Sequence, residues 1–323
     1  MPHISYRASS FGPHWGSALS GSHNLKVTWQ ELVWAAVTVG KPGVAYLLAH
    51  GWHSVSDNIV RSHTVYANLQ QVAGRLEKSS LYGALDPTEK GATSYLMGMM
   101  AAKILGNRLL STPWLLHVSM FPKLGGTLSL HSNSTPDLIG RTKSGDWIVL
   151  EAKGRTHGLS KLAMSTAKTQ TRQLRRFNGQ FPTLRAAVQA FFQPDLRFAI
   201  EDPDDYADDA EDLTFEPRQA FEKYYSGFLN RDARVLDIVE LEGQRYITQN
   251  HDEIGVTLGL DKRVVDRLSS LQDSALFAPL EQEAVGTKST GGFTVFPDGV
   301  AVALDARWSE ARMRSAPAAR RDG

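Results

Sequence analysis

Two carboxylates and a lysine, Asp137, Glu151 and Lys153, stand at the ends of two expected β-strands. The apolar segments 137–141 and 147–152 predict the strands, and the Lys-Ser-Gly-Asp sequence between them predicts a tight turn. Alternate residues of a strand point to the same face, so Lys153 is expected beside Glu151. Carboxylate oxygens suit Mg²⁺, and a bound cation activates water and neutralises charge on a phosphodiester under attack. The pattern therefore predicts metal-dependent phosphodiester hydrolysis.

The distribution of charge along the chain points to a polyanionic substrate. Residues 90–194 hold fourteen Lys and Arg but only three acids, so this segment has a net charge of +11. The whole chain carries +1, which leaves −10 for the rest. A basic segment whose few acids fall within one motif is typical of proteins that bind a polyanion such as nucleic acid.

Chance matches of short motifs weigh against this prediction. Pro-Asp dipeptides begin at four positions, Pro136, Pro194, Pro203 and Pro297, so the dipeptide alone carries no information. An acid-x-Lys sequence occurs only once, at residues 151–153. The alternative to a catalytic site is two ordinary strands with charged ends.

The sequences Pro136-Asp137 and Glu151-Ala152-Lys153 resemble the motif of the PD-(D/E)xK nuclease superfamily, over roughly residues 86–200. The resemblance implies an α/β fold with a restriction-endonuclease-like core, a mixed sheet flanked by helices. In that core four strands follow the order helix, three strands, helix, strand. The expected elements follow this order with one additional strand before the second helix: a helix from residue 86 to about 105, strands at 114–121, 126–130, 137–141 and 147–152, a helix at 160–177 and a strand at 196–200.

The resemblance also implies roles for individual residues. Asp137 and Glu151 would ligate Mg²⁺, for which Mn²⁺ would substitute, and the carbonyl of Ala152 would complete the protein's ligands. Lys153 would orient the attacking water or help to deprotonate it, and would offset charge at the scissile phosphate.

Two further residues have both a functional and a structural interpretation. In the superfamily the first helix often gives an acid to the metal, which makes Glu89 a candidate ligand, but a capping box with Asp86 explains it equally well. Gln170 falls on the apolar face of the helix expected at 160–177. Several branches of the superfamily carry a catalytic glutamine there, with a lysine two positions before it, as Lys168 is here. The alternative is a glutamine hydrogen-bonded to backbone.

The helix expected at 160–177 is strongly basic. No acid occurs from Ala152 to Pro194, whereas a solvated helix face usually mixes charges. We therefore expect nucleic-acid contacts from five of its side chains, Lys161, Lys168, Arg172, Arg175 and Arg176. The alternative is that this helix pairs with the segment 201–212, which holds eight acids and no base.

The chain as a whole divides into four expected regions: an N-terminal helical region at 1–80, the nuclease-like core at 81–200, a C-terminal α+β region at 201–306, and a basic, flexible tail at 307–323. Residues 1–24 are expected to be irregular. Further elements are predicted from apolar periodicity and turn residues: helices at 29–39, 56–77 and 261–271, and strands at 234–241, 245–249, 294–296 and 300–304.

Composition narrows the class of protein. The chain has no cysteine, which excludes disulfides and thiolate-bound zinc. No apolar run is long enough to span a bilayer, and the N-terminus lacks the apolar segment of a signal peptide. We therefore expect a cytoplasmic protein with no membrane partner.

Together these features predict a Mg²⁺-dependent nuclease that hydrolyses DNA, and analogy with the superfamily points to restriction or antiviral defence. The alternative is a non-cleaving or partner-gated nucleic-acid-binding subunit with a nuclease-like fold. The sequence leaves open whether RNA is the substrate, whether cleavage is internal, and whether a homodimer or a partner subunit is needed.

Overall fold

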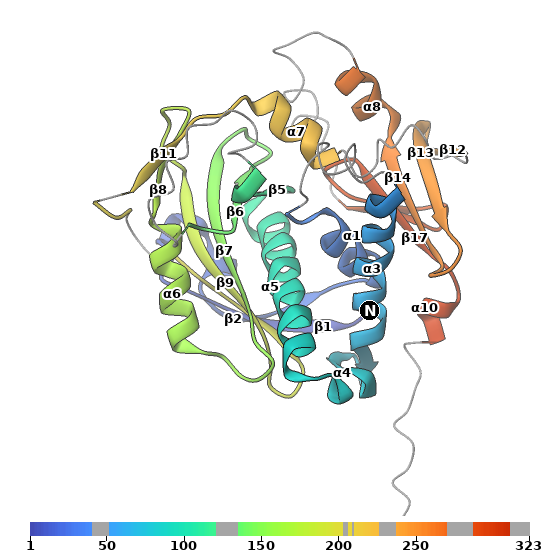
Figure 1. The fold of residues 1–323 in the computed structure, drawn as a ribbon, viewed down its shortest axis with the longest axis horizontal. Coiled ribbons are helices and arrows are strands. Elements are labelled where there is room, and N and C mark those ends of the chain that lie inside the picture. Colours follow the sequence, from blue (N-terminus) through green and yellow to red (C-terminus); the bar gives the residue numbers. More distant parts are fainter. Residues whose placement is uncertain are drawn as a thin grey trace, which may run out of the picture.

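The computed structural model describes residues 1–40, 52–120, 135–202, 206–208, 210–225, 237–269 and 287–310. It is a mixed α/β structure in which helices pack on a large mixed sheet, and a smaller sheet lies beside them (Figure 1). The α/β class expected from sequence is confirmed.

The large sheet contains nine strands: β1 (His3–Ser9), β2 (Gly21–Lys26), β3 (Leu69–Val72), β4 (Arg75–Lys78), β5 (Trp114–His117), β6 (Leu138–Arg141), β7 (Trp147–Gly154), β9 (Leu184–Phe192) and β10 (Leu196–Glu201). Their order is β3-β4-β1-β10-β9-β7-β6-β5, with β2 paired to β1. The strands β5, β6 and β7 run antiparallel, and β9 is parallel to β7. Strand β10 is antiparallel to β9 and parallel to β1.

Two smaller sheets accompany it. A parallel pair joins β8 (Leu174–Phe177) to β11 (Glu211–Leu213). An antiparallel sheet has the order β12-β13-β14-β17-β16-β15, and its strands are β12 (Asp237–Leu241), β13 (Gln244–His251), β14 (Val256–Asp261), β15 (Lys288–Thr290), β16 (Phe293–Val295) and β17 (Val300–Leu304).

The helices are α1 (Trp29–Thr38), α3 (Trp52–Asn68), α4 (Ser80–Ala84), α5 (Pro87–Leu110), α6 (Lys161–Thr171), α7 (Pro217–Tyr225), α8 (Lys262–Ser269) and α10 (Arg307–Glu310). Three short 3₁₀ helices are η1 (Pro13–Trp15), η2 (Ser17–Leu19) and η3 (Val118–Met120). Within the described residues, none of the helices combines the length and the apolar character needed to cross a membrane.

Strand β9 lies between two layers of helix and is buried along its whole length. Val188 belongs to the main hydrophobic cluster, together with buried residues of α5. Ala187 and Phe191 instead pack with Met164 of α6. Because neighbouring residues of a strand point to opposite faces, α5 and α6 cover opposite faces of the sheet (Figure 1).

Helix α5 begins as the sequence predicts. Asp86 accepts hydrogen bonds from the backbone N–H groups of Thr88 and Glu89, and Glu89 accepts one from the backbone of Asp86. The helix continues beyond the expected end at residues 106–107 to Leu110. Gly106 does not end it, because the left-handed conformation that closes the helix is adopted by Ser111 instead.

The N-terminal region differs from its prediction. The helix expected at 56–77 ends at Asn68, and the chain then forms the β3–β4 hairpin. The segment 1–24, expected to be irregular, supplies β1 and part of β2. Because β1 pairs with β10, this region contributes strands to the large sheet as well as helices.

Several core elements also differ. The helix expected at 160–177 ends at Thr171, and its last residues form β8 instead. Strand β9 was not predicted at all. The strand expected at 114–121 ends at His117, and the one expected at 126–130 lies outside the described residues.

The C-terminal region agrees more closely with its prediction. The hairpin predicted around residues 297–299 is confirmed, since β16 and β17 pair antiparallel across it. The tail was expected to be flexible from residue 307, but residues 307–310 form α10 and Trp308 is buried. The rest of the predicted tail lies outside the described residues.

Candidate active site

The motif residues meet where β6 begins and β7 ends. The two strands pair with Leu138 opposite Leu150, so Asp137 lies close to Glu151. The backbone N–H of Asp137 donates to Oε2 of Glu151 at 2.6 Å, and the backbone N–H of Ala152 donates to Oδ2 of Asp137 at 3.2 Å. Each carboxylate is therefore held by the backbone of the strand segment that carries the other.

Lys153 joins this group from β7, two residues beyond Glu151. Its Nζ donates to Oε1 of Glu151 and, at 2.7 Å, to Oε1 of Gln170 on α6. Gln170 in turn donates through Nε2 to the carbonyl of Thr135 at 3.4 Å. The structure thus brings together four of the predicted residues, and Gln170 contacts both the lysine and the backbone.

The electrostatics of the site centre on Glu151, which is fully buried. Burial, with a smaller contribution from the negative charge of Asp137, raises the pKa of Glu151 from 4.5 to about 8. The contact with Lys153 acts in the opposite direction but does not cancel these effects. A divalent cation at the two carboxylates would relieve this unfavourable negative charge.

The predicted metal donors are oxygen atoms, which are the ligands that Mg²⁺ accepts. In the part of the chain that the structure describes, no group of three or more His, Asp or Glu side chains is placed to hold a metal ion. The predicted set has only two side chains, Asp137 and Glu151, with the backbone of Ala152 as a third donor. Mg²⁺ usually keeps several waters and binds through one or two carboxylates.

Two residues near the site were missed by the sequence analysis. His117, at the end of β5, has its Nε2 3.9 Å from Oδ1 of Asp137, and burial lowers the pKa of His117. Tyr95 on α5 is half-exposed, and its pKa is raised by burial first and then by the nearby charges of Asp137 and Glu151. Both come close through the register of β5 on β6 and the packing of α5, which no local pattern specifies.

Glu89, the other predicted metal ligand, has a structural role. Its Oε2 accepts from the backbone N–H of Asp86 at 3.1 Å, which completes the capping box. Helix α5 contacts the end of β7 at Ser94 and at Gly98, five and nine residues further on and so about 7 and 13 Å along the helix axis. The structure shows the capping role of Glu89, and a role at the metal stays a prediction.

Two glycines allow α5 to approach the end of β7. A Cβ at Gly98 would lie 2.7 Å from the backbone carbonyl carbon of Lys153, and a Cβ at Gly154 would lie 1.6 Å from the carbonyl oxygen of Ser94. Neither distance is tolerable, so a side chain at either position forces the backbone of α5 or β7 to move. The position of Lys153 depends on this close packing.

The substitution Gly98→Ala is therefore expected to destabilise the protein by about 1–3 kcal/mol, because the new Cβ would displace the backbone at Lys153. Gly91→Ala, in the same helix but with open space around it, is the control and should be neutral or slightly stabilising. Urea denaturation of both variants measures the difference. Equal behaviour of the two variants would contradict the packing argument.

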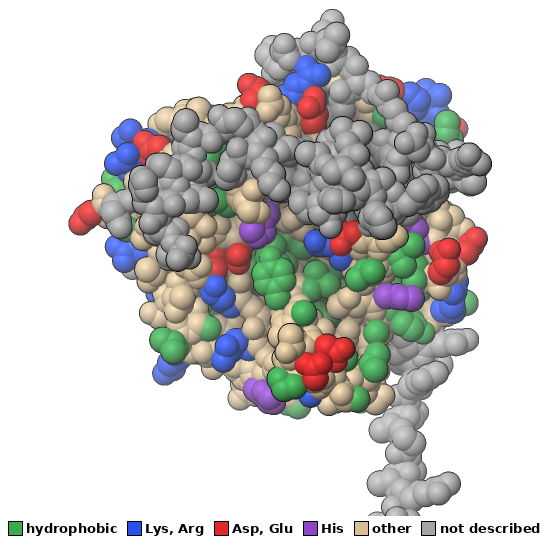
Figure 2. All heavy atoms as spheres, in the orientation of Figure 1, with side chains coloured by type: hydrophobic (Ala, Val, Ile, Leu, Met, Phe, Trp, Pro, Cys, Tyr) green, Lys and Arg blue, Asp and Glu red, His purple; other side chains and the backbone are tan. Residues whose placement is uncertain are grey.

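The five predicted nucleic-acid contacts fall into two groups. Lys161 and Lys168 lie on α6, and Arg172 caps its end. Arg175 and Arg176 lie instead on β8, so their placement on the helix was wrong. Figure 2 shows Lys and Arg side chains over and beside α6, to the left of a hydrophobic area over the middle of α5.

The two arginines of β8 have protein partners. Arg175 makes a double contact with Asp212, at 2.9 and 3.0 Å. The guanidinium of Arg176 lies 4.6 Å from the ring centre of Phe181. The pairing of Arg175 with Asp212 agrees with the alternative in which the acidic segment 201–212 neutralises part of the basic region.

Comparisons with known proteins add no relative: no protein family model, no curated protein and no solved structure matches this chain.

Proposed function

We propose that this protein is a Mg²⁺-dependent nuclease that hydrolyses DNA phosphodiester bonds at Asp137, Glu151 and Lys153. The observation that carries the proposal is the convergence of two carboxylates, a lysine and Gln170 through direct hydrogen bonds. The element order also supports it, because α5, β5–β7, α6 and β9 follow the order of a restriction-endonuclease-like core, with β9 parallel to β7.

The chain's own residues have complementary tasks in this proposal. Asp137 and Glu151 would hold the cation, which when bound would supply an activated water and offset negative charge at the phosphate. Lys153 lies on the open side of Glu151 with about a quarter of its side chain exposed, so it can reach both water and phosphate. Gln170 orients the lysine by accepting one of its N–H groups, and its own amide is fixed by the carbonyl of Thr135.

An ordinary pair of strand-end charges does not account for this arrangement. Charged groups at strand ends normally face solvent, whereas Glu151 is fully buried and keeps a pKa far above its usual value. Groups with strongly shifted pKa values, held beside a second acid and a lysine, are typical of functional sites.

The test is incubation of the purified protein with linear, circular and single-stranded DNA, in Mg²⁺ or in EDTA. Asp137→Asn and Lys153→Met should each reduce Mg²⁺-dependent cleavage by a factor on the order of 10² or more. Asp146→Asn, in the turn between β6 and β7, is the control and should retain activity. DNA binding without cleavage would favour a binding subunit, and cleavage that survives both site substitutions would disprove the site.

A further inference from the structure

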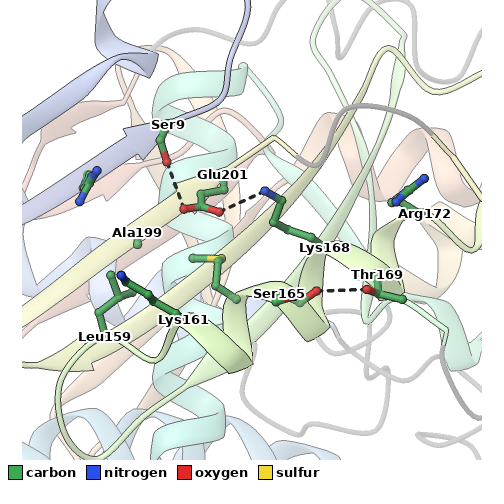
Figure 3. Close-up of a pocket in the computed structure, with 11 residues that line it drawn as sticks. Ser9, Leu159, Lys161, Ser165, Lys168, Thr169, Arg172, Ala199 and Glu201 are labelled. Carbon is green, nitrogen blue, oxygen red and sulfur yellow. Dashed lines mark hydrogen bonds and ion pairs between the residues drawn. The ribbon is translucent and has the colours of Figure 1, made fainter.

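A concave surface lies beside α6, on the side of the helix away from β7 and towards β10 and β1. It is a hollow of about 510 Å³, shown in Figure 3. Four cations line it, Arg7 from β1 and Lys161, Lys168 and Arg172 from α6 and its cap, together with a single acid, Glu201 of β10. We call this surface the α6 hollow.

The topology of the sheet explains why the hollow is open. Helix α6 packs mainly against β7 and β9. It reaches β10 through the contact of Met164 with the buried Ala199, whereas Arg7 of β1 is exposed. These strands pair in parallel, with Arg7 opposite Ala199 and Ser9 opposite Glu201. Alternate residues share a face, so Arg7 and Ser9 point to the side on which α6 lies. The α6 hollow is therefore bounded by α6 on one side and by the neighbouring face of β10 and β1 on the other.

The lining has the chemistry of a phosphate site. Ser9, Ser165 and Thr169 contribute hydroxyl groups, and the cations stand around them. No ion pair involves Arg7 or Lys161 among the described residues, so two of the four positive charges have no counter-charge there. Lysine, arginine and hydroxyl side chains are the groups that commonly contact nucleic-acid backbone.

Glu201 occupies the middle of this cationic surface. Its Oε1 accepts from the hydroxyl of Ser9 at 3.2 Å, and its Oε2 lies 3.4 Å from Nζ of Lys168. Figure 3 shows the carboxylate between these two partners. A carboxylate that receives one hydroxyl and one ammonium group uses the same donors that a phosphate oxygen would use.

We propose that the α6 hollow binds backbone phosphates of a nucleic-acid strand, and that Glu201 takes the place of a phosphate until the strand binds. This inference rests on the proposed function, since α6 carries both Gln170 at the active site and the cations of the hollow. A strand whose scissile phosphate lies at Lys153 passes α6, and a basic groove can follow its backbone.

The experiment measures binding of a labelled single-stranded oligonucleotide in EDTA, where cleavage does not interfere, over a range of salt concentrations. Arg7→Gln and Lys161→Gln should each weaken binding by about threefold to tenfold and reduce the salt slope by about one. Glu201→Gln should tighten binding by about twofold to fivefold, because Lys168 and Ser9 are then released for phosphate.

Matched controls separate these effects from net charge. Arg245→Gln removes an exposed charge from β13. Glu242→Gln breaks the exposed pair between Glu242 and Lys288, at the six-stranded sheet that contains β13. Neither should change binding beyond twofold. The inference is overturned if Arg7→Gln and Glu201→Gln behave like these controls, or if a mononucleotide binds as tightly as the oligonucleotide.

Failure of this inference and failure of the proposed function give different results. If Asp137→Asn abolishes cleavage while the hollow variants bind normally, the nuclease site stands and the hollow has no part in binding. If the wild-type protein neither binds nor cleaves nucleic acid, both proposals fail.

Discussion

The substitution Asp298→Ala is expected to lower the free energy of unfolding by about 3–5 kcal/mol, among the largest effects of any single change in this chain. Asp298 lies in the turn between β16 and β17 and is fully buried. Its Oδ2 is 3.3 Å from Nζ of Lys103 on α5, which is also fully buried. Removal of the carboxylate leaves the amine of Lys103 either charged without a counter-charge or forced to give up its proton, and both outcomes cost free energy in the protein interior.

Lys103 and Asp298 each make further hydrogen bonds to buried groups. Trp34 of α1 donates its indole N–H to Oδ2 of Asp298 at 2.9 Å, and the hydroxyl of Tyr224 in α7 donates to the same oxygen at 2.6 Å. Lys103 also donates to the carbonyl of Pro113 and to Tyr224. Burial lowers the pKa of Lys103 to about 8 despite the opposing effect of Asp298. One polar network therefore joins α1, α5, α7 and the six-stranded sheet that contains β16 and β17.

Urea denaturation of three variants tests this argument. Asp266→Ala, which breaks an exposed pair with Lys262, should cost less than about 1 kcal/mol. The double variant Lys103→Met with Asp298→Ala should be more stable than Asp298→Ala alone, because it removes the buried amine that has lost its partner. An effect of Asp298→Ala no larger than that of Asp266→Ala would show that water reaches Lys103.

The parts of the fold that sequence predicted are those specified by adjacent residues. The capping box at Asp86 and the β6–β7 hairpin depend on side chains within a few positions of each other, and both are present as expected. The same is true of the turn around Asp298. The close approach of Asp137, Glu151 and Lys153 follows from that hairpin, so local pattern sufficed to find it.

Strand β9 was missed because its polar residues have distant partners. Arg185 donates to the carbonyl groups of Leu174 and Arg175 in β8, and Gln189 exchanges hydrogen bonds with the backbone of Ser160 before α6. These residues interrupt the apolar run, although both are buried. The strand exists because β7 and β10 pair with its two edges, which a single sequence does not reveal.

The end of α6 was misplaced for a related reason. Leu174 and Phe177 are spaced three residues apart, which suits a helical face, and both are buried. In the structure they belong to β8, which pairs with β11 almost forty residues later. As a consequence, two of the predicted nucleic-acid contacts, Arg175 and Arg176, lie on β8 and not on the helix.

The substitution Glu151→Gln is expected to abolish cleavage and yet to stabilise the metal-free protein at alkaline pH. In the unfolded chain this carboxyl ionises near 4.5, whereas in the folded protein its pKa is about 8. Between these values the folded protein holds a proton that the unfolded chain has lost. The contribution of this group to the free energy of unfolding is therefore fully present below pH 4.5. It declines as the pH rises, by at most about 1.4 kcal/mol per pH unit, and is lost once the pH has passed through 8.

An amide at this position resembles the protonated acid and cannot ionise, so the variant should lack this loss. Free energies of unfolding in EDTA, measured from pH 5 to 9, should diverge in favour of Glu151→Gln as the pH rises. Glu240→Gln, at an exposed position on β12, should follow the wild type.

Addition of Mg²⁺ should reverse the order of stability, because in the proposed site the cation would bind the ionised carboxylates. We expect it to raise the Tm of the wild type, more at pH 8 than at pH 6, and to leave the variant nearly unchanged. Parallel stability curves in EDTA would mean that Glu151 is ionised at neutral pH without a metal. An equal response of both proteins to Mg²⁺ would place the cation elsewhere, whereas the expected reversal would link the buried charge of Glu151 directly to metal binding.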